Sequence, residues 1–273
     1  TTEIYTLSLH DALPILSGEL KNFFSDSDPY KVLKKLEGNV YREVKNRKTL
    51  QFEFNGKSYF AKIHTGVGWI EILKNLIQLK SPVIGAKNEW SALKLLRSTS
   101  IKTMTVVAYG EKGWNPAKRQ SFIITEDLQQ TISLEDYCLN WLDSKPQFSE
   151  RKALICKVAE IASALHSCGI CHRDLYLCHF LLHKEESKFP QISVIDLHRA
   201  LIREQLPKRW VIKDIAGLYY SAMSIGLTSR DIQRFIWQYS KLNKNFTARE
   251  NGEFWMRVKE KAIRMHKKLG PAR

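Results

Sequence analysis

The pattern of the chain changes near Asp127, and this change limits the folds that it can adopt. Before that residue, runs rich in aromatic and β-branched residues predict strands. These runs cover residues 40–44, 49–54, 57–63, 103–109 and 119–125. After it, apolar residues at helical spacing predict helices over 134–141, 150–167, 213–225, 229–241 and 253–269. The sequence therefore predicts an α+β protein, with an antiparallel β-rich N-lobe followed by a mainly helical C-lobe.

Individual turn and capping residues predict where several of these elements begin, end or connect. Asn55-Gly56 lies between two strand-like runs and predicts a tight hairpin. Ser149 is expected to cap the helix at 150–167, and Gly169 is expected to end it. Two short apolar runs, at 180–182 and 192–195, predict a second and smaller hairpin.

Two helices are expected within the β-rich half, at residues 69–80 and 88–97. The first is bounded by Gly68 and Pro82, and its polar residues fall on one side, which leaves a wide apolar face. Two explanations stay open for this face. Packing in the core of the N-lobe is the simpler one, and contact with lipid is the other.

The charge of the chain favours anionic partners. The 273 residues include 43 Lys and Arg against 28 Asp and Glu, a formal net charge of +15. Such an excess attracts nucleic acid, anionic membrane surfaces, phosphorylated substrates or acidic proteins. We predict no nucleic-acid partner, because the sequence has neither zinc-finger spacing nor an RNP-type aromatic motif. No run of residues is apolar enough for a membrane-spanning helix.

The first sixteen residues differ from the rest. They are nearly uncharged, whereas the chain is rich in lysine from Lys21 onward, and they lack the basic start of a signal peptide. We interpret residues 1–16 as a non-native or disordered tail. The expected N-lobe then covers 17–127 and the expected C-lobe covers 128–273.

The most informative motif is His172-Arg173-Asp174, with Asp196 following 22 positions after Asp174 at the end of a strand-like run. This arrangement resembles the catalytic loop and the metal-binding aspartate of the protein-kinase-like superfamily. In phosphoryl transfer, one carboxylate accepts or orients the proton of the attacking hydroxyl, and another holds Mg²⁺ against the phosphates. The resemblance therefore implies that Asp174 is the catalytic base and that Asp196 binds Mg²⁺ and ATP.

Further parts of a nucleotide site occur upstream in the expected order. Lys62 lies on a predicted strand and would contact the α- and β-phosphates, and Glu89, 27 positions later, would pair with it. The backbone groups of Glu126 and Leu128 would bind adenine at the hinge between the lobes. Each residue alone has a simpler explanation: a solvated edge lysine, a helix N-terminal charge, or a loop acid. Their order along the chain favours the kinase interpretation.

The sequence also departs from the protein-kinase pattern. The expected nucleotide loop has one glycine, Gly38, and the second metal-ligand position holds His179 in place of asparagine. Imidazole can bind metal, although Mg²⁺ prefers oxygen, so His179 is either a metal ligand or a structural residue. Asp214, 18 positions after Asp196, is expected to brace the catalytic loop. So short a segment favours a small-molecule or glycan acceptor over a protein substrate.

Longer segments resemble one family within this superfamily, the lipopolysaccharide core heptose(I) kinases. The similarity runs from about residue 19 to beyond residue 239, and in that family a histidine stands where His179 does. The segments that carry it are Lys62-Ile63-His64-Thr65-Gly66, Pro82-Val83-Ile84-Gly85-Ala86, Ser121-Phe122-Ile123-Ile124-Thr125-Glu126-Asp127-Leu128, Thr131-Ile132-Ser133-Leu134-Glu135-Asp136-Tyr137-Cys138, Cys178-His179-Phe180-Leu181-Leu182-His183 and Ser193-Val194-Ile195-Asp196-Leu197-His198-Arg199-Ala200.

This resemblance implies an ATP- and Mg²⁺-dependent sugar kinase that phosphorylates the first heptose of the lipopolysaccharide inner core. It also implies a cytoplasmic enzyme, peripheral at the inner face of a Gram-negative inner membrane, with an inner-core glycolipid as substrate and acyl carrier protein as a further partner. A basic C-terminal stretch at 257–268 would lie on anionic lipid or be a solvated helix face. The alternatives are a kinase of another core sugar or small molecule, and a non-catalytic kinase-like module.

Overall fold

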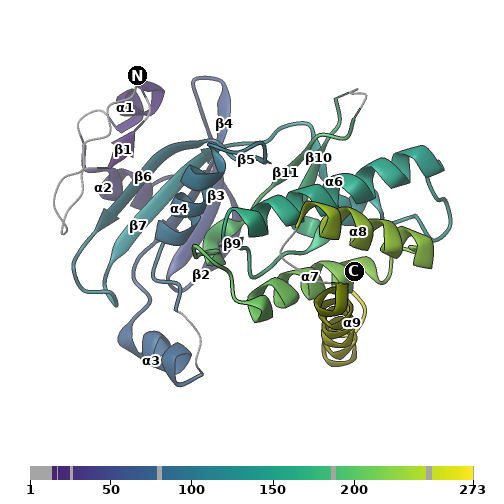
Figure 1. Cartoon of the computed structure of the whole chain (residues 1–273). Coiled ribbons are helices and arrows are strands. Elements are labelled where there is room, and N and C mark those ends of the chain that lie inside the picture. Colours follow the sequence, from purple (N-terminus) through teal and green to yellow (C-terminus); the bar gives the residue numbers. More distant parts are fainter. Residues whose placement is uncertain are drawn as a thin grey trace. The chain divides into compact units, whose positions relative to one another are not determined.

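The computed structural model describes residues 14–16, 18–24, 27–78, 82–185, 189–243 and 248–272. The chain divides into two compact units, which we describe separately (Figure 1). The first comprises residues 1–95 and 104–128, and the second comprises 96–103 and 129–273.

The first unit is built on a six-stranded antiparallel sheet with the order β1-β6-β7-β4-β3-β2. Its strands are β1 (Ile15–Leu16), β2 (Asn39–Val44), β3 (Arg47–Phe54), β4 (Lys57–His64), β6 (Val106–Lys112) and β7 (Gln120–Glu126). The predicted hairpin joins β3 to β4, where Asn55 and Gly56 both have positive φ as a two-residue turn of this kind requires. The last two residues of the stretch interpreted as a tail form β1, and residues 1–13 of that stretch lie outside the described residues.

Four helices accompany this sheet: α1 (Gly18–Phe24), α2 (Pro29–Lys34), α3 (Trp69–Ile77) and α4 (Lys87–Leu96). The core lies where α1 and α2 meet β3, β4, β6 and β7, and it includes Leu20, Phe24, Leu33, Leu50, Phe52, Tyr59, Phe122 and Ile124. Helix α4 packs against β6 through Trp90, whose ring stacks on that of Tyr109 at a centroid distance of 4.5 Å. This contact holds α4 against the sheet.

Helix α3 shows that the simpler explanation of its apolar face, packing in the core, is wrong. Of its apolar side chains, only Ile72 is buried, whereas the other five are exposed. The helix ends at Ile77, and the last two residues of the predicted segment, 79 and 80, lie outside the described residues.

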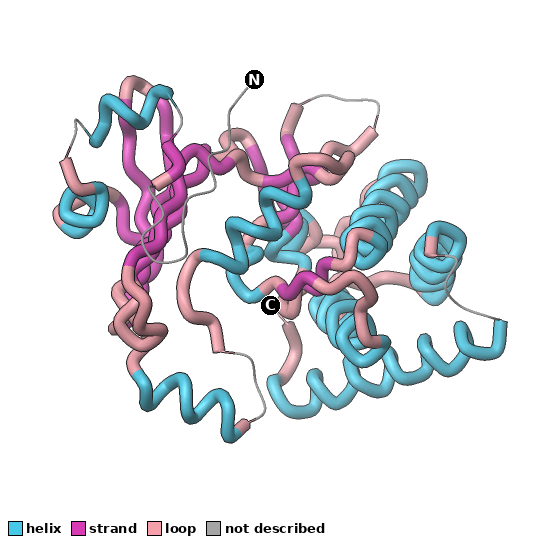
Figure 2. The backbone as a smooth tube through the Cα atoms, turned by 60° about the vertical axis from the view of Figure 1, so that its left-hand side comes forward, coloured by secondary structure: helices cyan, strands magenta, loops and turns pink. Residues whose placement is uncertain are grey.

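The second unit is mainly helical, with α5 (Leu134–Tyr137), α6 (Phe148–Ser167), α7 (Lys208–Ala222), α8 (Ser229–Leu242) and α9 (Ala248–Leu269) (Figure 2). A small sheet has the order β5-β11-β10-β8 and consists of β5 (Lys102–Thr103), β8 (Thr131–Ser133), β10 (Phe180–His183) and β11 (Ile192–Val194). Strands β10 and β11 form the predicted second hairpin. β9 (Ile170–Cys171) pairs with β12 (Leu201–Ile202), and short 3₁₀ helices cover Leu177–His179 and Leu197–Arg199.

Several expectations about helix ends need correction, and one is confirmed. Helix α6 begins at Phe148 after Gln147, so Ser149 is not its cap. Helix α5 ends at Tyr137 instead of 141. Helices α7 and α9 begin at Lys208 and Ala248, each five residues before the predicted start. Gly169 does end α6: its φ is +73°, and a Cβ there would lie 2.0 Å from the carbonyl oxygen of Arg203. Among the helices of the described ranges, none is long and apolar enough to cross a bilayer.

Candidate active site

The loop that carries the His-Arg-Asp motif is held by one buried carboxylate. Asp214, on α7, is 1% exposed and accepts hydrogen bonds from the backbone N–H groups of His172 at 2.6 Å and Arg173 at 2.7 Å. These bonds fix Arg173 at a φ of +73°, a conformation that non-glycine residues adopt rarely. The expected brace between Asp214 and this loop is therefore present.

A second layer of polar contacts lies behind Asp214. His166 of α6 places Nε2 3.4 Å from the Asp214 carboxylate and Nδ1 2.8 Å from the hydroxyl of Tyr239 on α8. Burial opposes ionisation of Asp214, but the hydrogen bonds from the His166 side chain and the His172 backbone outweigh it and hold the pKa of this carboxyl below its ordinary value. Asp214 therefore stays ionised as a charged acceptor for the loop.

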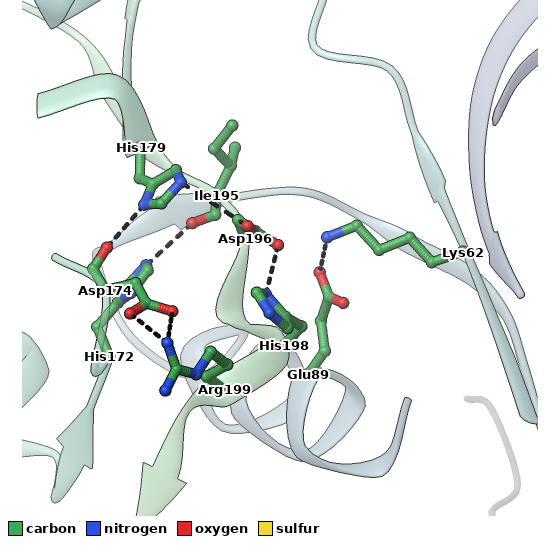
Figure 3. Close-up of polar contacts among 9 residues, drawn as sticks. All are labelled: Lys62, Glu89, His172, Asp174, His179, Ile195, Asp196, His198 and Arg199. Atoms are coloured by element: carbon green, nitrogen blue, oxygen red, sulfur yellow. Dashed lines mark hydrogen bonds and ion pairs between the residues drawn. The ribbon is translucent and has the colours of Figure 1, made fainter. Parts of the chain in front are cut away.

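The Asp174 side chain points toward Arg199, on the 3₁₀ helix that follows Asp196 (Figure 3). Nη1 of Arg199 donates to both carboxylate oxygens, at 2.8 and 3.0 Å. Each oxygen of a carboxylate offers about two lone-pair sites, so a carboxylate held in this way can still accept a bond from a hydroxyl. Sequence reasoning did not assign Arg199 a role, and the available signal was a basic residue three positions after Asp196.

Asp196 lies within hydrogen-bonding distance of one histidine and near another. Its backbone is left-handed, with φ 60° and ψ 53°. Oδ1 accepts from Nδ1 of His198 at 2.8 Å, and Oδ2 lies 3.7 Å from Nε2 of His179. Figure 3 shows both rings directed at this carboxylate. The two residues predicted as candidate metal ligands, Asp196 and His179, therefore lie close together.

The other nitrogen of His179 is held by the backbone. Nδ1 lies 2.7 Å from the carbonyl oxygen of Asp174 and donates to it, which turns Nε2 toward Asp196. His172 stacks on His179 at 5.5 Å and directs its own Nε2 to the carbonyl of Ile195 at 3.0 Å. Burial lowers the pKa of His172, which keeps its ring neutral and a donor to that carbonyl.

As metal ligands, Asp196 and His179 fit a Mg²⁺ ion in part. Within the described residues, no group of three or more His, Cys, Asp or Glu side chains could hold a metal alone. Mg²⁺ bound with nucleotides typically takes one or two carboxylates, with phosphate and water oxygens completing its shell. The carboxylate of Asp196 suits this pattern, whereas the Nε2 of His179 is a poorer ligand for so hard an ion.

In the first unit, Lys62 and Glu89 form the predicted ion pair. Nζ of Lys62, on β4, lies 2.7 Å from Oε1 of Glu89, on α4 (Figure 3). β4 is paired on both sides, with β3 and β7, and Glu89 is fully buried. Lys62 is therefore not a solvated edge lysine, and Glu89 is not an exposed charge at a helix terminus.

The remaining predicted contacts lie at the end of β7 and before β2. The N–H of Glu126 donates to the carbonyl of Thr105 at 2.9 Å, so this N–H already has a partner within the first unit. Asp127, between Glu126 and Leu128, accepts a hydrogen bond from Gln51 at 2.9 Å. Gly38 packs so closely on β3 that a Cβ there would lie 2.2 Å from the carbonyl oxygen of Gln51.

Comparisons with known proteins agree with this fold. Residues 31–239 match the model of the "Lipopolysaccharide kinase (Kdo/WaaP) family". An Escherichia coli protein named lipopolysaccharide core heptose(I) kinase WaaP is 52% identical over 230 residues, covering 81% of this chain and 86% of its own. A Pseudomonas aeruginosa protein of the same name is 46% identical over 228 residues, covering 82% and 85%. A solved structure, "WaaP in complex with acyl carrier protein", has a TM-score of 0.80 and 37% identity, covering 93% of this chain and 100% of that one.

The fold and these similarities thus define an ATP-dependent sugar kinase with a protein-kinase-like architecture. The chain belongs to the lipopolysaccharide kinase (Kdo/WaaP) family.

Proposed function

We propose that this chain transfers the γ-phosphate of ATP to a hydroxyl of the first heptose in the lipopolysaccharide inner core. The observation that carries the proposal is the identity of 46–52% to curated kinases of that substrate, over more than four fifths of the chain. The contacts of Asp174, Asp196 and Lys62 support it, because each has the surroundings that its expected role needs.

In this mechanism Asp174 acts on the acceptor. Its carboxylate accepts the proton of the attacking heptose hydroxyl, or orients that hydroxyl, while Arg199 holds both carboxylate oxygens in place. Lys62, fixed by Glu89, binds the α- and β-phosphates. Mg²⁺, when bound through Asp196 with His179 beside it, would neutralise the charge of the phosphates. The backbone of Glu126 and Leu128 binds adenine.

The surroundings of Asp174 favour an anionic acceptor. Burial, and then the neighbouring charge of Arg199, lower the pKa of both Arg173 and Lys213 from their ordinary values. The side chains of Arg173, Lys213 and Arg199 thus surround the single carboxylate of Asp174, which leaves a local excess of positive charge. Acidic or phosphorylated sugars beside the acceptor heptose would be attracted to it.

The membrane surface is the second proposed partner, which would place the enzyme at the inner face of the inner membrane. Helix α9 buries Phe254, Val258 and Ala262 on one side. Its other side exposes Arg257, Lys259, Arg264, Lys267 and Lys268 against Glu253 and Glu260. A basic helix face of this kind is attracted to anionic lipid, with roughly 1 kcal/mol for each cation near the surface.

Acyl carrier protein is the third proposed partner, because a solved relative is named in complex with one. The net charge of +15 suits an acidic protein. In addition, the second unit contains an apolar cavity of about 470 Å³ among α6, α7, α8 and α9, and its apolar lining suits a hydrocarbon chain. Binding of acylated and unacylated carrier protein, measured at low and high salt, would test this partner.

The kinase proposal is tested with ATP-Mg²⁺ and core lipopolysaccharide that lacks heptose phosphate. Mass spectrometry should locate one new phosphate on the first heptose. Asp174→Asn should reduce turnover by about 10²–10⁴-fold, while the matched exposed change Asp143→Asn should leave it unaltered. Phosphate on another sugar would instead support a kinase of that sugar, and absence of turnover with every core acceptor would support a non-catalytic module.

A further inference from the structure

Helix α3 exposes an unusually large apolar surface for its length. Ile70 is 87% exposed and Ile77 is 82% exposed. The full set of exposed apolar side chains is Trp69, Ile70, Leu73, Leu76 and Ile77. Ile72, at 5% exposure, is the one apolar side chain of α3 that is buried. Figures 1 and 2 both show α3 extending away from the end of the sheet.

These side chains form one continuous face. At 100° per residue, the apolar residues of α3 fall within a single arc of about 160°. Glu71, Lys74, Asn75 and Gln78 occupy the opposite side. Asn75 there donates to both the carbonyl and the carboxylate of Glu71, at 2.8 and 3.0 Å, so part of the polar side is satisfied within the helix. Soluble proteins rarely leave such a face open unless it meets a partner or a membrane.

Two loops hold the start of α3 in place. The N–H of Thr65 donates to the carbonyl of Asn46 at 3.1 Å, and that of Gly68 donates to the carbonyl of Ala117 at 2.9 Å. Gly66, at φ +98°, allows this close approach, because a Cβ there would lie 2.8 Å from the same Ala117 oxygen. The helix is thus anchored through the residues that lead into it, while its apolar face stays open.

The same loops carry groups that suit the surface of an anionic bilayer. Trp114, in the loop that contains Ala117, is 75% exposed, and tryptophan favours the boundary between headgroups and acyl chains. The exposed charged residues of α3 and of these two loops are Lys45, Lys74 and Lys118 against Glu71. This excess of lysine is complementary to acidic headgroups.

We infer that α3 inserts its apolar face into the interfacial layer of an anionic membrane, with Trp114 and the neighbouring lysines at headgroup depth. At nine residues the helix is about 14 Å long, which is too short to span a bilayer and long enough to lie in its surface. The inference rests on the proposed function in one respect, since a lipid-linked acceptor brings the enzyme to such a surface.

Vesicle flotation tests the inference with the full chain. Vesicles of phosphatidylethanolamine and phosphatidylglycerol should carry the wild-type protein to the top of a density gradient. The triple variant Ile70→Ser, Leu73→Ser, Ile77→Ser removes apolar area from the face and should lower the partition coefficient by about tenfold or more. The matched control Leu139→Ser changes a side chain that is 62% exposed in the second unit and should float like the wild type.

Brominated lipids give a second, independent measurement. They quench tryptophans that reach the acyl chains, so the wild type should lose fluorescence on binding, and Trp69→Phe should lose measurably less. Equal flotation of the triple variant, together with equal quenching of Trp69→Phe, would overturn the inference. Dissociation of a wild-type dimer by the triple variant, without any change in lipid binding, would also overturn it and identify α3 as a contact between copies.

Activity on a water-soluble, delipidated core oligosaccharide separates this inference from the proposed function. The triple variant should keep wild-type activity there, because α3 contains none of the proposed catalytic residues. Failure of the wild type on that acceptor would count against the kinase proposal. Failure of flotation with intact activity would count against the membrane role of α3.

Discussion

Replacing Asp214 with asparagine should loosen the catalytic loop and destabilise the protein. Asp214 is buried, carries a charge, and accepts two backbone hydrogen bonds, from His172 at 2.6 Å and Arg173 at 2.7 Å. The asparagine side chain would keep one acceptor oxygen, while its amide NH₂ would face the second backbone N–H. One buried donor would then be unpaired, and the remaining bond would lose its charge.

The size of the effect follows from these contacts. A buried donor without a partner costs about 1–3 kcal/mol, and loss of charge assistance weakens the other bond by about 1 kcal/mol. The sum is about 3 kcal/mol, which for a chain of this size lowers Tm by about 6–12 °C. The freed loop also displaces Asp174, and a displacement near 1 Å can reduce turnover by about 10²-fold.

The pH dependence of this effect has a definite sign. The folded-state pKa of Asp214 lies below its ordinary value, so its ionised form contributes stability above the unfolded pKa, about 3.9. That contribution is lost as the pH falls through the folded pKa. The Tm difference between wild type and Asp214→Asn should therefore be constant between about pH 5 and 8 and shrink below about pH 4.

Thermal unfolding followed by circular dichroism, with kinetics on the same preparations, measures both effects. Asp143→Asn, an exposed change of the same chemistry, is the control and should alter stability by no more than about 0.5 kcal/mol. An Asp214→Asn protein with both Tm and turnover equal to wild type would refute the claim that Asp214 holds the loop.

Three other substitutions have clear expected outcomes. Glu89→Gln weakens the contact that fixes Lys62 and should lower kcat/KM for ATP by about tenfold or more; unchanged ATP kinetics would contradict that role. Asp231→Ala removes the capping box at the start of α8 and the contacts of Asp231 with Arg151 and Arg234. It should lower the free energy of unfolding, measured in urea, by about 2–4 kcal/mol, and a loss below about 1 kcal/mol would show that these bonds add little to stability. Gly38→Ala places a Cβ 2.2 Å from the Gln51 carbonyl oxygen and should raise KM for ATP. An unaltered KM would show that the loop that contains Gly38 takes no part in nucleotide binding.

Much of the fold was predictable because its elements carry local signals. The hairpin at Asn55-Gly56 and the end of α6 at Gly169 both depend on residues that favour positive φ, and such signals are visible in one sequence. Helices α1 and α2 were not expected, because segments of seven and six residues are too short to show a helical period. Their positions are set by packing on the sheet.

Periodicity also has a limit that α3 illustrates. The spacing of its polar residues correctly indicated one apolar face, but a pattern of this kind does not say what covers that face. Core packing was the simpler expectation, and the exposure of Ile70 and Leu73 contradicts it. Burial depends on where neighbouring segments lie, which one sequence without tertiary contacts does not reveal.

The candidate site was predictable in its residue types and less so in its contacts. The pairing of Lys62 with Glu89 followed from the order of motifs, and the distance of 2.7 Å confirms it. The roles proposed for these residues in catalysis stay predictions. Arg199 was missed because its contact with Asp174 spans 25 positions and is made by two loops that only the fold brings together.

Backbone strain gives an independent reason to place the chemistry at this loop pair. Arg173 and Asp196 are two of the four non-glycine residues with positive φ in the described part of the chain, while Asn55 lies in a hairpin turn. The short polar side chain of aspartate can hydrogen-bond locally in this conformation, whereas that of arginine has no such compensation. Holding Arg173 at a positive φ therefore costs about 1–3 kcal/mol. Such a cost persists only where surrounding contacts over-determine the backbone, and the two bonds to Asp214 supply them. A loop that needed only to connect β9 to the next element could relax, so the strain at Arg173 indicates that the position of Asp174 is what the fold maintains.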